Sequence, residues 1–514
     1  MTTTRRQFLR QATHGLGFLA AATTLPSWLG PTAHAATAPA TGSRALVCVF
    51  LLGGNDSNNI LVPRGTEAYR QYGLARPTLG LEPKDLEFIT PTNPGIGPFS
   101  MPTTLGRLRA HFEQGRAAFV SNVGPLVKPL IPADYSDTDP FLPENLFSHS
   151  DQQDAWASAL ANPGTSTVDL PLKVTGWGGR AADKLHVLNA DVDYPEVTSF
   201  GGKPRFCAGL ERKPMVVGSD GILAFRTITN PNPSALDQHH RQALLSVMAE
   251  QDGNPLEAGY ADVFVTARTF AEARAQAREA AWAKLPMTTQ STLKDYFSPP
   301  TNEPDTDTSR WTLHTQLLQV VKDLVAGAMP TPNGGLGMRR QVFSVGFGSF
   351  DTHQNQREDH AQLLKQLDFA LDAFQKAATL LESETSFGSN APQVTLFTMS
   401  DFNRTLVENG GGGTDHAWGG HALVLGSRVA GRKLYGLYPD LTNWRSQSTD
   451  TRGRWIPTLS VEQYGWTLAS WLGLSTEAER DHVFPNLGDY VLAAQSSQFP
   501  DQARAYSVGF MMPD

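Results

Sequence analysis

Residues 45–54 read ALVCVFLLGG, a continuous apolar run that ends at two glycines. Such a run is typical of a strand that is buried on both faces of a parallel sheet. Similar runs recur at residues 117–123, 341–347, 393–399 and, in a shorter form, 422–425. Helical periodicity lies between them, over residues 105–114, 311–328 and 360–381. Strands that alternate with helices predict an α/β fold, with a mostly parallel sheet sandwiched by helices.

The composition narrows the class of protein. With 514 residues, 40% of them hydrophobic and 18% charged, the chain is far too apolar to be disordered. The formal charge is -8 and no Lys/Arg cluster lies outside the N-terminus, so we do not expect a nucleic-acid partner. The two cysteines, Cys48 and Cys207, form no CxxC pair, and Cys48 lies within the first apolar run. A buried thiol is therefore favoured over a disulfide.

The N-terminus has the pattern of a signal peptide. Residues 5–10 read RRQFLR, an uncharged stretch covers residues 15–29, and Ala33-His34-Ala35 resembles a cleavage site. The paired arginines resemble a twin-arginine signal, so we expect the twin-arginine machinery to export the chain to the periplasm or beyond. Residues 1–35 would be removed and residues 36–514 would form one domain, within which residues 231–300 predict an inserted helical layer or cap. No later segment is apolar enough for a stable membrane span.

Acids and histidines follow the predicted strands. In open α/β sheets the loops after the strand ends build the site, so we expect these side chains at one edge. They are Asp56, Asp351, His353, Asp401, Asp415, His416 and His421. Mixed carboxylate and imidazole ligands suit zinc, manganese or a two-metal arrangement. The sequence therefore predicts a divalent metal site with one or two ions.

Each of these residues also has a purely structural explanation. An aspartate after a strand often caps a helix or forms a turn, Asp415 and His416 fit a hydrogen bond within a loop, and His421 fits a buried core histidine. Because so many acids and histidines are expected at the same edge of the sheet, a metal site is favoured over these separate structural roles.

Two further residues are candidates for catalysis. Ser148, in FSHSDQQD at residues 147–154, starts a predicted helix, where helix amides and a metal activate a nucleophile. The alternative is a plain N-cap, with Asp151 at the capping-box position. Arg404 is suited to bind an oxyanion with two hydrogen bonds, and the alternative is an ion pair with a nearby acid.

Five strings, in order, resemble a known family. They are GGNDSNNILVP, FSHSDQQDAW, FDTHQNQ, SDFNRT and TDHAWGGH, and they span residues 53–421. They resemble secreted proteins grouped as the domain-of-unknown-function 1501 family, which looks related to the alkaline phosphatase and sulfatase superfamily. The resemblance implies an alkaline-phosphatase-like α/β sandwich with a two-metal site at the sheet edge.

The resemblance also implies roles for single residues. Asp56 matches a metal ligand beside the nucleophile, and Ser148 falls where that nucleophile appears. Asp351 and His353 resemble the acid and histidine of the other metal. Asp401 resembles the acid of an Asp-His pair that ends a late strand, and the final imidazole would be one of the following: His416 or His421.

The sequence also departs from the superfamily pattern. Phe402 stands where a histidine usually follows the late-strand acid, and Asp351 lies closer to His353 than usual. Both departures argue against a second metal. The sulfatase signature, Cys or Ser followed by x-Pro-x-Arg, is absent around both cysteines, so formylglycine chemistry is not expected.

These observations predict an exported metal-dependent hydrolase of phosphate or sulfate esters. Zinc, manganese or calcium would be its metal, and an anionic small molecule or a glycan ester its substrate. The alternative is a non-catalytic periplasmic binding or assembly protein that retains the fold. A serine esterase is disfavoured because the chain has no GxSxG.

Overall fold

The structure of the chain is a computed structural model. It describes residues 42–136, 141–161, 172–189, 191–202, 204–219, 234–249, 255–301, 308–495 and 499–513. The predicted signal peptide, residues 1–35, lies outside the described residues. Residues Ala40–Asp514 form one compact unit.

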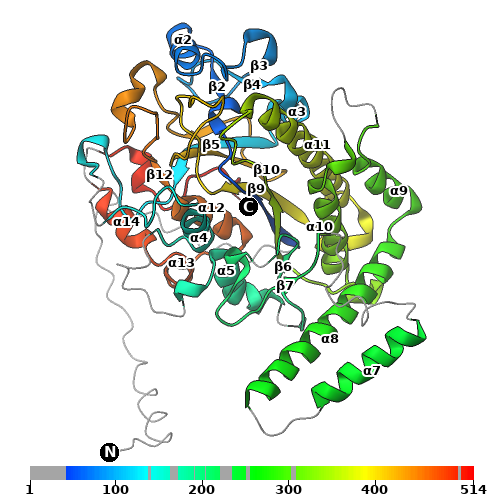
Figure 1. Ribbon diagram of the computed structural model, residues 1–514. Coiled ribbons are helices and arrows are strands. Elements are labelled where there is room, and N and C mark those ends of the chain that lie inside the picture. Colours follow the sequence, from blue (N-terminus) through cyan, green and yellow to red (C-terminus); the bar gives the residue numbers. More distant parts are fainter. Residues whose placement is uncertain are drawn as a thin grey trace, which may run out of the picture. The chain divides into compact units, whose positions relative to one another are not determined.

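A nine-stranded sheet is the centre of the described part of this unit (Figure 1). Its strand order is β11-β5-β10-β9-β1-β8-β6-β7, and β12 pairs with β5 beside this path. The strands are β1 (Arg44–Leu51), β5 (Ala117–Gly124), β6 (Val197–Ser199), β7 (Met215–Val216), β8 (Arg340–Phe347), β9 (Gln393–Ser400), β10 (Gly420–Gly426), β11 (Leu434–Gly436) and β12 (Leu459–Ser460). Only β10 runs antiparallel to its neighbours, so the predicted α/β class and mostly parallel sheet are confirmed.

Strand β1 shows why its apolar run is continuous. Successive side chains of a strand point to opposite faces, and both faces of β1 are buried. Ala45, Val47, Val49 and Leu51 belong to one hydrophobic cluster. The alternate residues Leu46, Cys48 and Phe50 belong to a second cluster on the other face. Cys48 and Cys207 are both buried free thiols, as predicted.

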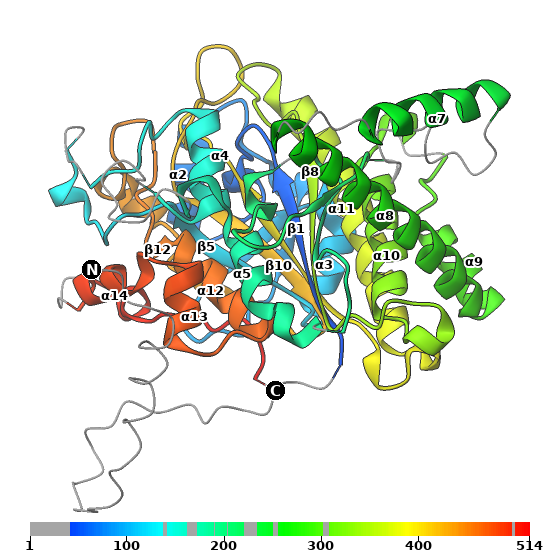
Figure 2. The ribbon, with the colours of Figure 1, turned by 90° about the horizontal axis from the view of Figure 1, so that it is seen from below.

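Helices cover both faces of the sheet, as Figures 1 and 2 show. The first face is covered by α3 (Gly106–Glu113), α8 (Pro255–Lys284), α9 (Met287–Tyr296), α10 (Leu313–Ala328) and α11 (Gln356–Glu382). The second face is covered by α4 (His149–Ser158), α5 (Trp177–Leu185), α12 (Val461–Leu472), α13 (Glu477–Val483) and α14 (Leu487–Ala493). The predicted helices at residues 105–114, 311–328 and 360–381 correspond to α3, α10 and α11.

Two smaller parts complete the described chain. A three-stranded antiparallel sheet consists of β2 (Val62–Pro63), β4 (Phe99–Pro102) and β3 (Leu86–Ile89), and α2 (Thr66–Ala75) lies near it. Within residues 231–300, the described residues form α7 (Ala235–Ala249), α8 and α9. Helix α8 packs on α10 and α9 packs on α11, so these two helices extend the layer on the first face. No helix in the described ranges combines the length and apolarity needed to cross a membrane.

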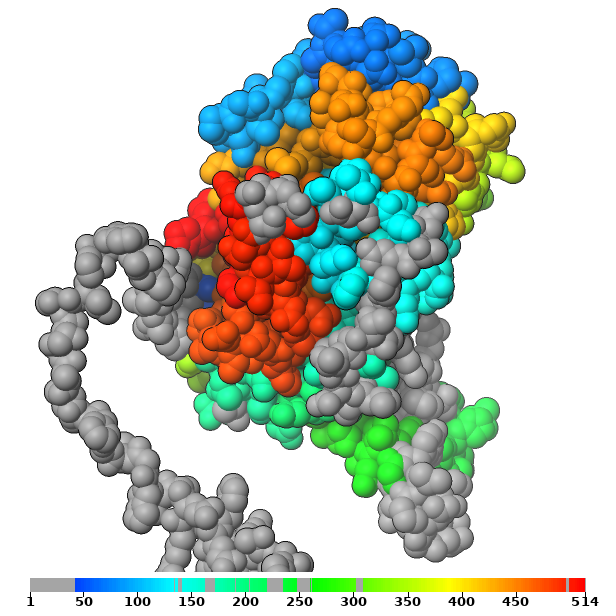
Figure 3. Space-filling view, turned by 90° about the vertical axis from the view of Figure 1, so that its left-hand side faces the viewer, coloured from blue at the N-terminus to red at the C-terminus, as the bar shows by residue number. Residues whose placement is uncertain are grey.

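The strand register brings several loops to one edge of the sheet. Leu51 of β1 pairs with Phe347 of β8 and with Ser400 of β9, so the loops after these three parallel strands start at the same level. Because β10 runs the other way, its first residues lie at this edge. Helix α4 begins here too, and its segment of the chain lies beside the carboxyl-terminal helices (Figure 3). Trp156 of α4 packs edge-on against Tyr464 of α12.

Candidate metal centre at the carboxyl edge of the sheet

Two glycines let the three loops approach closely. Gly53 and Gly54 both have positive φ angles, of 110° and 82°, which favour glycine. A Cβ on Gly53 would lie 2.5 Å from the Asp351 nitrogen, and one on Gly54 would lie 2.5 Å from the Phe402 ring. The loops after β8 and β9 therefore pack directly on the glycine turn after β1.

Three histidines and one aspartate converge at this edge. His149, Asp351 and His416 place ligand atoms within 4.8 Å of one another. His353 joins them, because its Nε2 lies 3.0 Å from Asp351 Oδ1 and 3.1 Å from His416 Nε2. His416 Nε2 is 3.3 Å from Asp351 Oδ1, and His149 Nε2 is 3.5 Å from Asp351 Oδ2. We call these four residues the His3Asp cluster.

The other ring nitrogen of each histidine faces a protein oxygen. His149 Nδ1 lies 2.6 Å from Asp401 Oδ2, and His353 Nδ1 lies 2.9 Å from Asp415 Oδ1. His416 Nδ1 lies 2.8 Å from the Phe147 carbonyl oxygen. Carboxylates and carbonyls only accept, so each of these contacts is a hydrogen bond when Nδ1 carries the proton. A neutral ring in that tautomer has its lone pair on Nε2, directed into the cluster.

Asp401 is fully buried behind the cluster. Its Oδ2 also accepts hydrogen bonds from the Gly53 amide, at 3.2 Å, and from Gln153 Nε2, at 3.0 Å. Phe402, the next residue, stacks on the His416 ring with centroids 4.5 Å apart and lies 4.8 Å from the His149 ring. The loop after β9 thus holds His149 and His416 in place and supplies no ligand atom to the cluster.

Arg404 is buried beneath the cluster and bonds to protein acceptors. It donates to the Gly54 carbonyl from Nε, to the Gly53 and Phe350 carbonyls from one terminal nitrogen, and to the Thr414 carbonyl from the other. It also forms a close ion pair with Asp351. The structure therefore shows the ion-pair alternative from the sequence, while binding of a substrate oxyanion stays a prediction.

Charges around the cluster are largely paired. Burial raises the pKa of Asp351, but the hydrogen bond and charge of Arg404 outweigh it and hold that pKa below its usual value. Burial also raises the pKa of Asp415, and hydrogen bonds from Asn409, His353 and Arg452 lower it below the usual value. Both carboxylates are therefore anionic at neutral pH.

Two of the predicted ligands lie elsewhere. Asp56 is fully buried, and both of its carboxylate oxygens accept hydrogen bonds from Arg76, at 2.5 and 2.9 Å. His421 is buried on β10, where its Nδ1 accepts from the Asn122 amide and its ring stacks on Tyr438. Burial lowers the pKa of His421 to about 3, so its ring is neutral. The structure does not bring either residue into the His3Asp cluster.

His149 is the ligand candidate that the sequence reasoning missed. It is the first residue of α4, directly after the predicted nucleophile Ser148. The Ser148 side chain does not cap the helix; its hydroxyl donates to Asp151 Oδ2 at 2.5 Å. The signal that pointed to Ser148, a polar string at a helix start, contains His149 as well.

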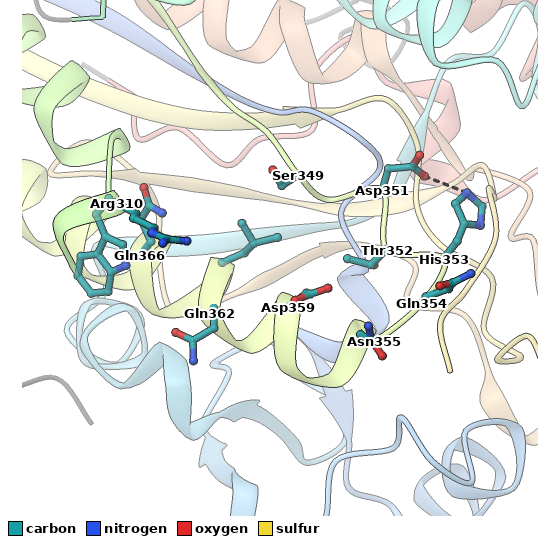
Figure 4. A pocket seen from close by; sticks show the side chains of 12 residues that line it. Arg310, Ser349, Asp351, Thr352, His353, Gln354, Asn355, Asp359, Gln362 and Gln366 are labelled. Carbon is teal, nitrogen blue, oxygen red and sulfur yellow. Dashed lines mark ion pairs between the residues drawn. The ribbon is translucent and has the colours of Figure 1, made fainter. Parts of the chain in front are cut away.

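A pocket of about 820 Å³ opens beside the cluster. Asp351 and His353 line one end of it, and Arg310 and Gln366 line the other, as Figure 4 shows. The side chains of the cluster remain accessible: Asp351 is 46% exposed, His353 42%, His149 32% and His416 22%. A small molecule can therefore reach the cluster from solvent.

One comparison with known proteins gives a match. A family model described as "Protein of unknown function (DUF1501)" matches residues 260–448. This range contains Asp351, His353, Asp401 and His416 and ends before α12; it does not contain His149. No curated protein matches the chain.

Proposed function

We propose that the protein is a metal-dependent hydrolase of phosphate or sulfate esters, with one divalent ion held by the His3Asp cluster. The observation that carries the proposal is the convergence of three imidazole Nε2 atoms on one carboxylate. The Nε2 atoms of His353 and His416 lie 3.1 Å apart, a close approach that a shared divalent cation would stabilise; the Arg404 guanidinium also lies near, with Nη1 3.5 Å from His353 Nε2.

The spacing supports a single small ion. In a tetrahedral site with bonds of about 2.0–2.1 Å, neighbouring ligand atoms are about 3.3 Å apart. Four of the six separations run from 3.0 to 3.5 Å, with His353 and His416 next to Asp351 Oδ1 and His149 next to Oδ2. His149, Asp351 and His416 are the three residues whose ligand atoms all lie within 4.8 Å of one another. Three imidazoles with one carboxylate favour zinc or manganese over calcium, which prefers oxygen ligands. Oxygen acceptors at all three Nδ1 atoms are also the usual outer support of metal-binding histidines.

Catalysis fits the site better than a structural metal. Asp351 and His353 line an open pocket. An ion held by three of the four cluster residues would keep its fourth position free for a substrate oxygen, as catalytic metal sites do. A bound divalent ion supplies Lewis-acid polarisation of an ester oxygen. Asp351 and Asp415 are each paired with an arginine, so Asp401 and the ion leave the site about one unit positive. That charge favours an anionic ester. Ser148 is the candidate nucleophile, with Asp151 placed to take its proton.

The second candidate function is non-catalytic binding of an anion. The observation in its favour is that the N–H groups of Arg404 donate to acceptors within the protein, so they are not available to stabilise negative charge on a reacting ester. Relationship to the alkaline phosphatase superfamily and export by the twin-arginine pathway to the periplasm also remain proposals from the sequence.

Metal content and turnover together test the proposal. We expect about one equivalent of zinc or manganese in the wild type and loss of the metal in His149→Ala and Asp351→Ala. His186→Ala is a matched control, because His186 has the same 2.6 Å contact from Nδ1 to a carboxylate, Glu196, and 34% exposure. It should keep the metal. A wild type that contains no metal and takes none up would overturn the proposal.

Activity is then measured with 4-nitrophenyl phosphate and 4-nitrophenyl sulfate. Metal-dependent turnover that is lost in His149→Ala and kept in His186→Ala supports the hydrolase. A metal-loaded protein that turns over no ester but binds phosphate or sulfate supports the second candidate. Ser148→Ala then decides whether the serine takes part.

A further inference from the structure

The pocket beside the His3Asp cluster extends well beyond the cluster itself. From Asp351 and His353 it runs along α11 to Arg310 and Gln366 (Figure 4). Its volume of about 820 Å³ lies within the range of roughly 300–1,000 Å³ that is typical of small-molecule sites. An ester that binds at the cluster therefore has room for a sizeable organic group.

The pocket lining outside the cluster is polar but nearly neutral. Beyond the cluster, its charged lining residues are Asp359 and Arg310, which have opposite signs. The uncharged polar lining residues are Ser349, Thr352, Gln354, Asn355, Gln362 and Gln366. Apolar lining comes from Trp311 and Leu363. A polyanion would need more cations here, and a lipid would need a more apolar wall.

Four of the lining residues carry carboxamides, which form hydrogen bonds readily with hydroxyl groups. An Asn or Gln side chain offers two donors and one acceptor on a single group, and a hydroxyl both donates and accepts. Gln366 Oε1 already accepts from the Thr312 and Leu313 amides, so Gln354 and Asn355 are the carboxamides best placed to bind a ligand rich in hydroxyls. The side chains of Gln354 and Asn355 are exposed at the end near the cluster.

Asn355 gives a second observation. It is the N-cap of α11 in a left-handed conformation, with φ of 48°, yet its side chain makes no capping hydrogen bond. Capping asparagines usually have an extended backbone, so the left-handed conformation explains why this amide does not cap the helix. Here the amide stays at the pocket wall (Figure 4).

We propose that the pocket binds the saccharide portion of a sugar phosphate or sugar sulfate, and this rests on the proposed function. The ester anion lies at the cluster, the sugar hydroxyls bond to the carboxamides, and Leu363 with the edge of Trp311 contacts the ring. Hydrolysis breaks the bond between the sugar oxygen and phosphorus or sulfur. Water supplies a hydroxide to that atom and a proton to the sugar oxygen, which releases phosphate or sulfate.

Substrate selectivity tests the inference. The probes are the 6-phosphates and 6-sulfates of glucose, galactose and N-acetylglucosamine, and the reference substrates are the 4-nitrophenyl esters. Asn355→Gly removes the amide and keeps the left-handed conformation, and Gln354→Ala removes the other exposed carboxamide of the pocket. We expect each to lower kcat/KM for the sugar esters about tenfold more than for the aryl esters. Glu358→Ala, on the same helix but outside the pocket, should change the two classes equally.

Direct binding measurements distinguish a failure of the proposed sugar site from a failure of the proposed hydrolase. Titration calorimetry with glucose and N-acetylglucosamine on metal-free protein should detect binding that weakens in Asn355→Gly. Metal-dependent aryl-ester turnover without sugar preference or sugar binding would overturn the inference and leave the hydrolase standing. Sugar binding without metal or turnover would support the pocket and remove the hydrolase.

Discussion

Two aspartates, Asp56 and Asp351, follow neighbouring parallel strands at the same edge, yet their surroundings differ completely. Asp56 is fully buried and forms an ion pair with Arg76, the residue directly after α2. Asp351 is 46% exposed and lies among three histidines and the pocket. In both cases burial raises the carboxyl pKa and an arginine lowers it below the usual value. An acid after a strand thus becomes a structural ion pair or a candidate ligand according to what a distant segment places beside it.

The largest expected effect comes from breaking the buried pair. Arg76→Met leaves Asp56 buried without its cation, which should lower the free energy of unfolding by about 3–5 kcal/mol. Asp351→Asn in metal-free protein should cost less, because that carboxylate is half exposed and its buried partner Arg404 keeps its hydrogen bonds to four backbone carbonyl oxygens. Urea denaturation of both variants measures the difference. Equal losses would contradict the distinction between the two aspartates.

Glu462 sharpens the comparison because it is a buried acid without a bidentate arginine. Burial raises its pKa to about 7, although the charge of Arg180 acts in the opposite direction. Since the folded pKa exceeds the unfolded one, the folded state loses stability as pH rises from about 4 to about 7, by about 3 kcal/mol in total. Glu462→Gln removes this dependence.

The check is the unfolding free energy of wild type and Glu462→Gln at pH 5 and pH 8. The unfolding free energy of the variant should increase relative to that of the wild type as pH rises. A constant difference between the two proteins at both pH values would show that Glu462 is not destabilised by its charge.

Metal removal tests whether Asp351, the exposed aspartate of the two, binds a metal that stabilises the fold. With free metal at a hundredfold excess over Kd, a chelator should lower the unfolding free energy by about 2.7 kcal/mol. The effect should persist in His186→Ala and vanish in Asp351→Ala. Thermal melts with and without chelator measure it. A chelator effect that survives in Asp351→Ala would place the metal elsewhere.

The smallest expected effect concerns the support of a single histidine. Asp415→Asn keeps an acceptor for His353 Nδ1 but removes the charge, and should weaken metal binding about 10–100-fold. Competition with a coloured chelator measures the affinity. Asp372→Asn, which alters the 3.0 Å contact of another carboxylate with a histidine, His111, is the control and should leave the affinity unchanged.

Much of the fold could be predicted because long apolar runs leave few alternatives. The runs that begin at residues 45, 117, 341 and 393 all became long buried strands. The strands β6, β7, β11 and β12 were not predicted, because two or three residues are too few to show a pattern.

The site could be predicted only where the strand-end rule applies. That rule selected Asp351 and His353, and the glycine-rich loop led to His416. It could not select His149, which comes from a helix start after a long irregular segment. The glycine-rich loop also led to His421, but that residue is already the second of β10, so its side chain is buried in the sheet.

Pairing of the first strand with the later ones also governs how the chain is made. Arg44 of β1 pairs with Arg340 and with Gln393. At about 5–20 residues per second, a ribosome needs on the order of tens of seconds to synthesise these partners after β1 has emerged. During that time an apolar strand has both edges open to other chains. Newly made protein should therefore be most prone to aggregation before residue 400 leaves the ribosome, and chaperones that bind extended apolar segments should act on residues 45–52.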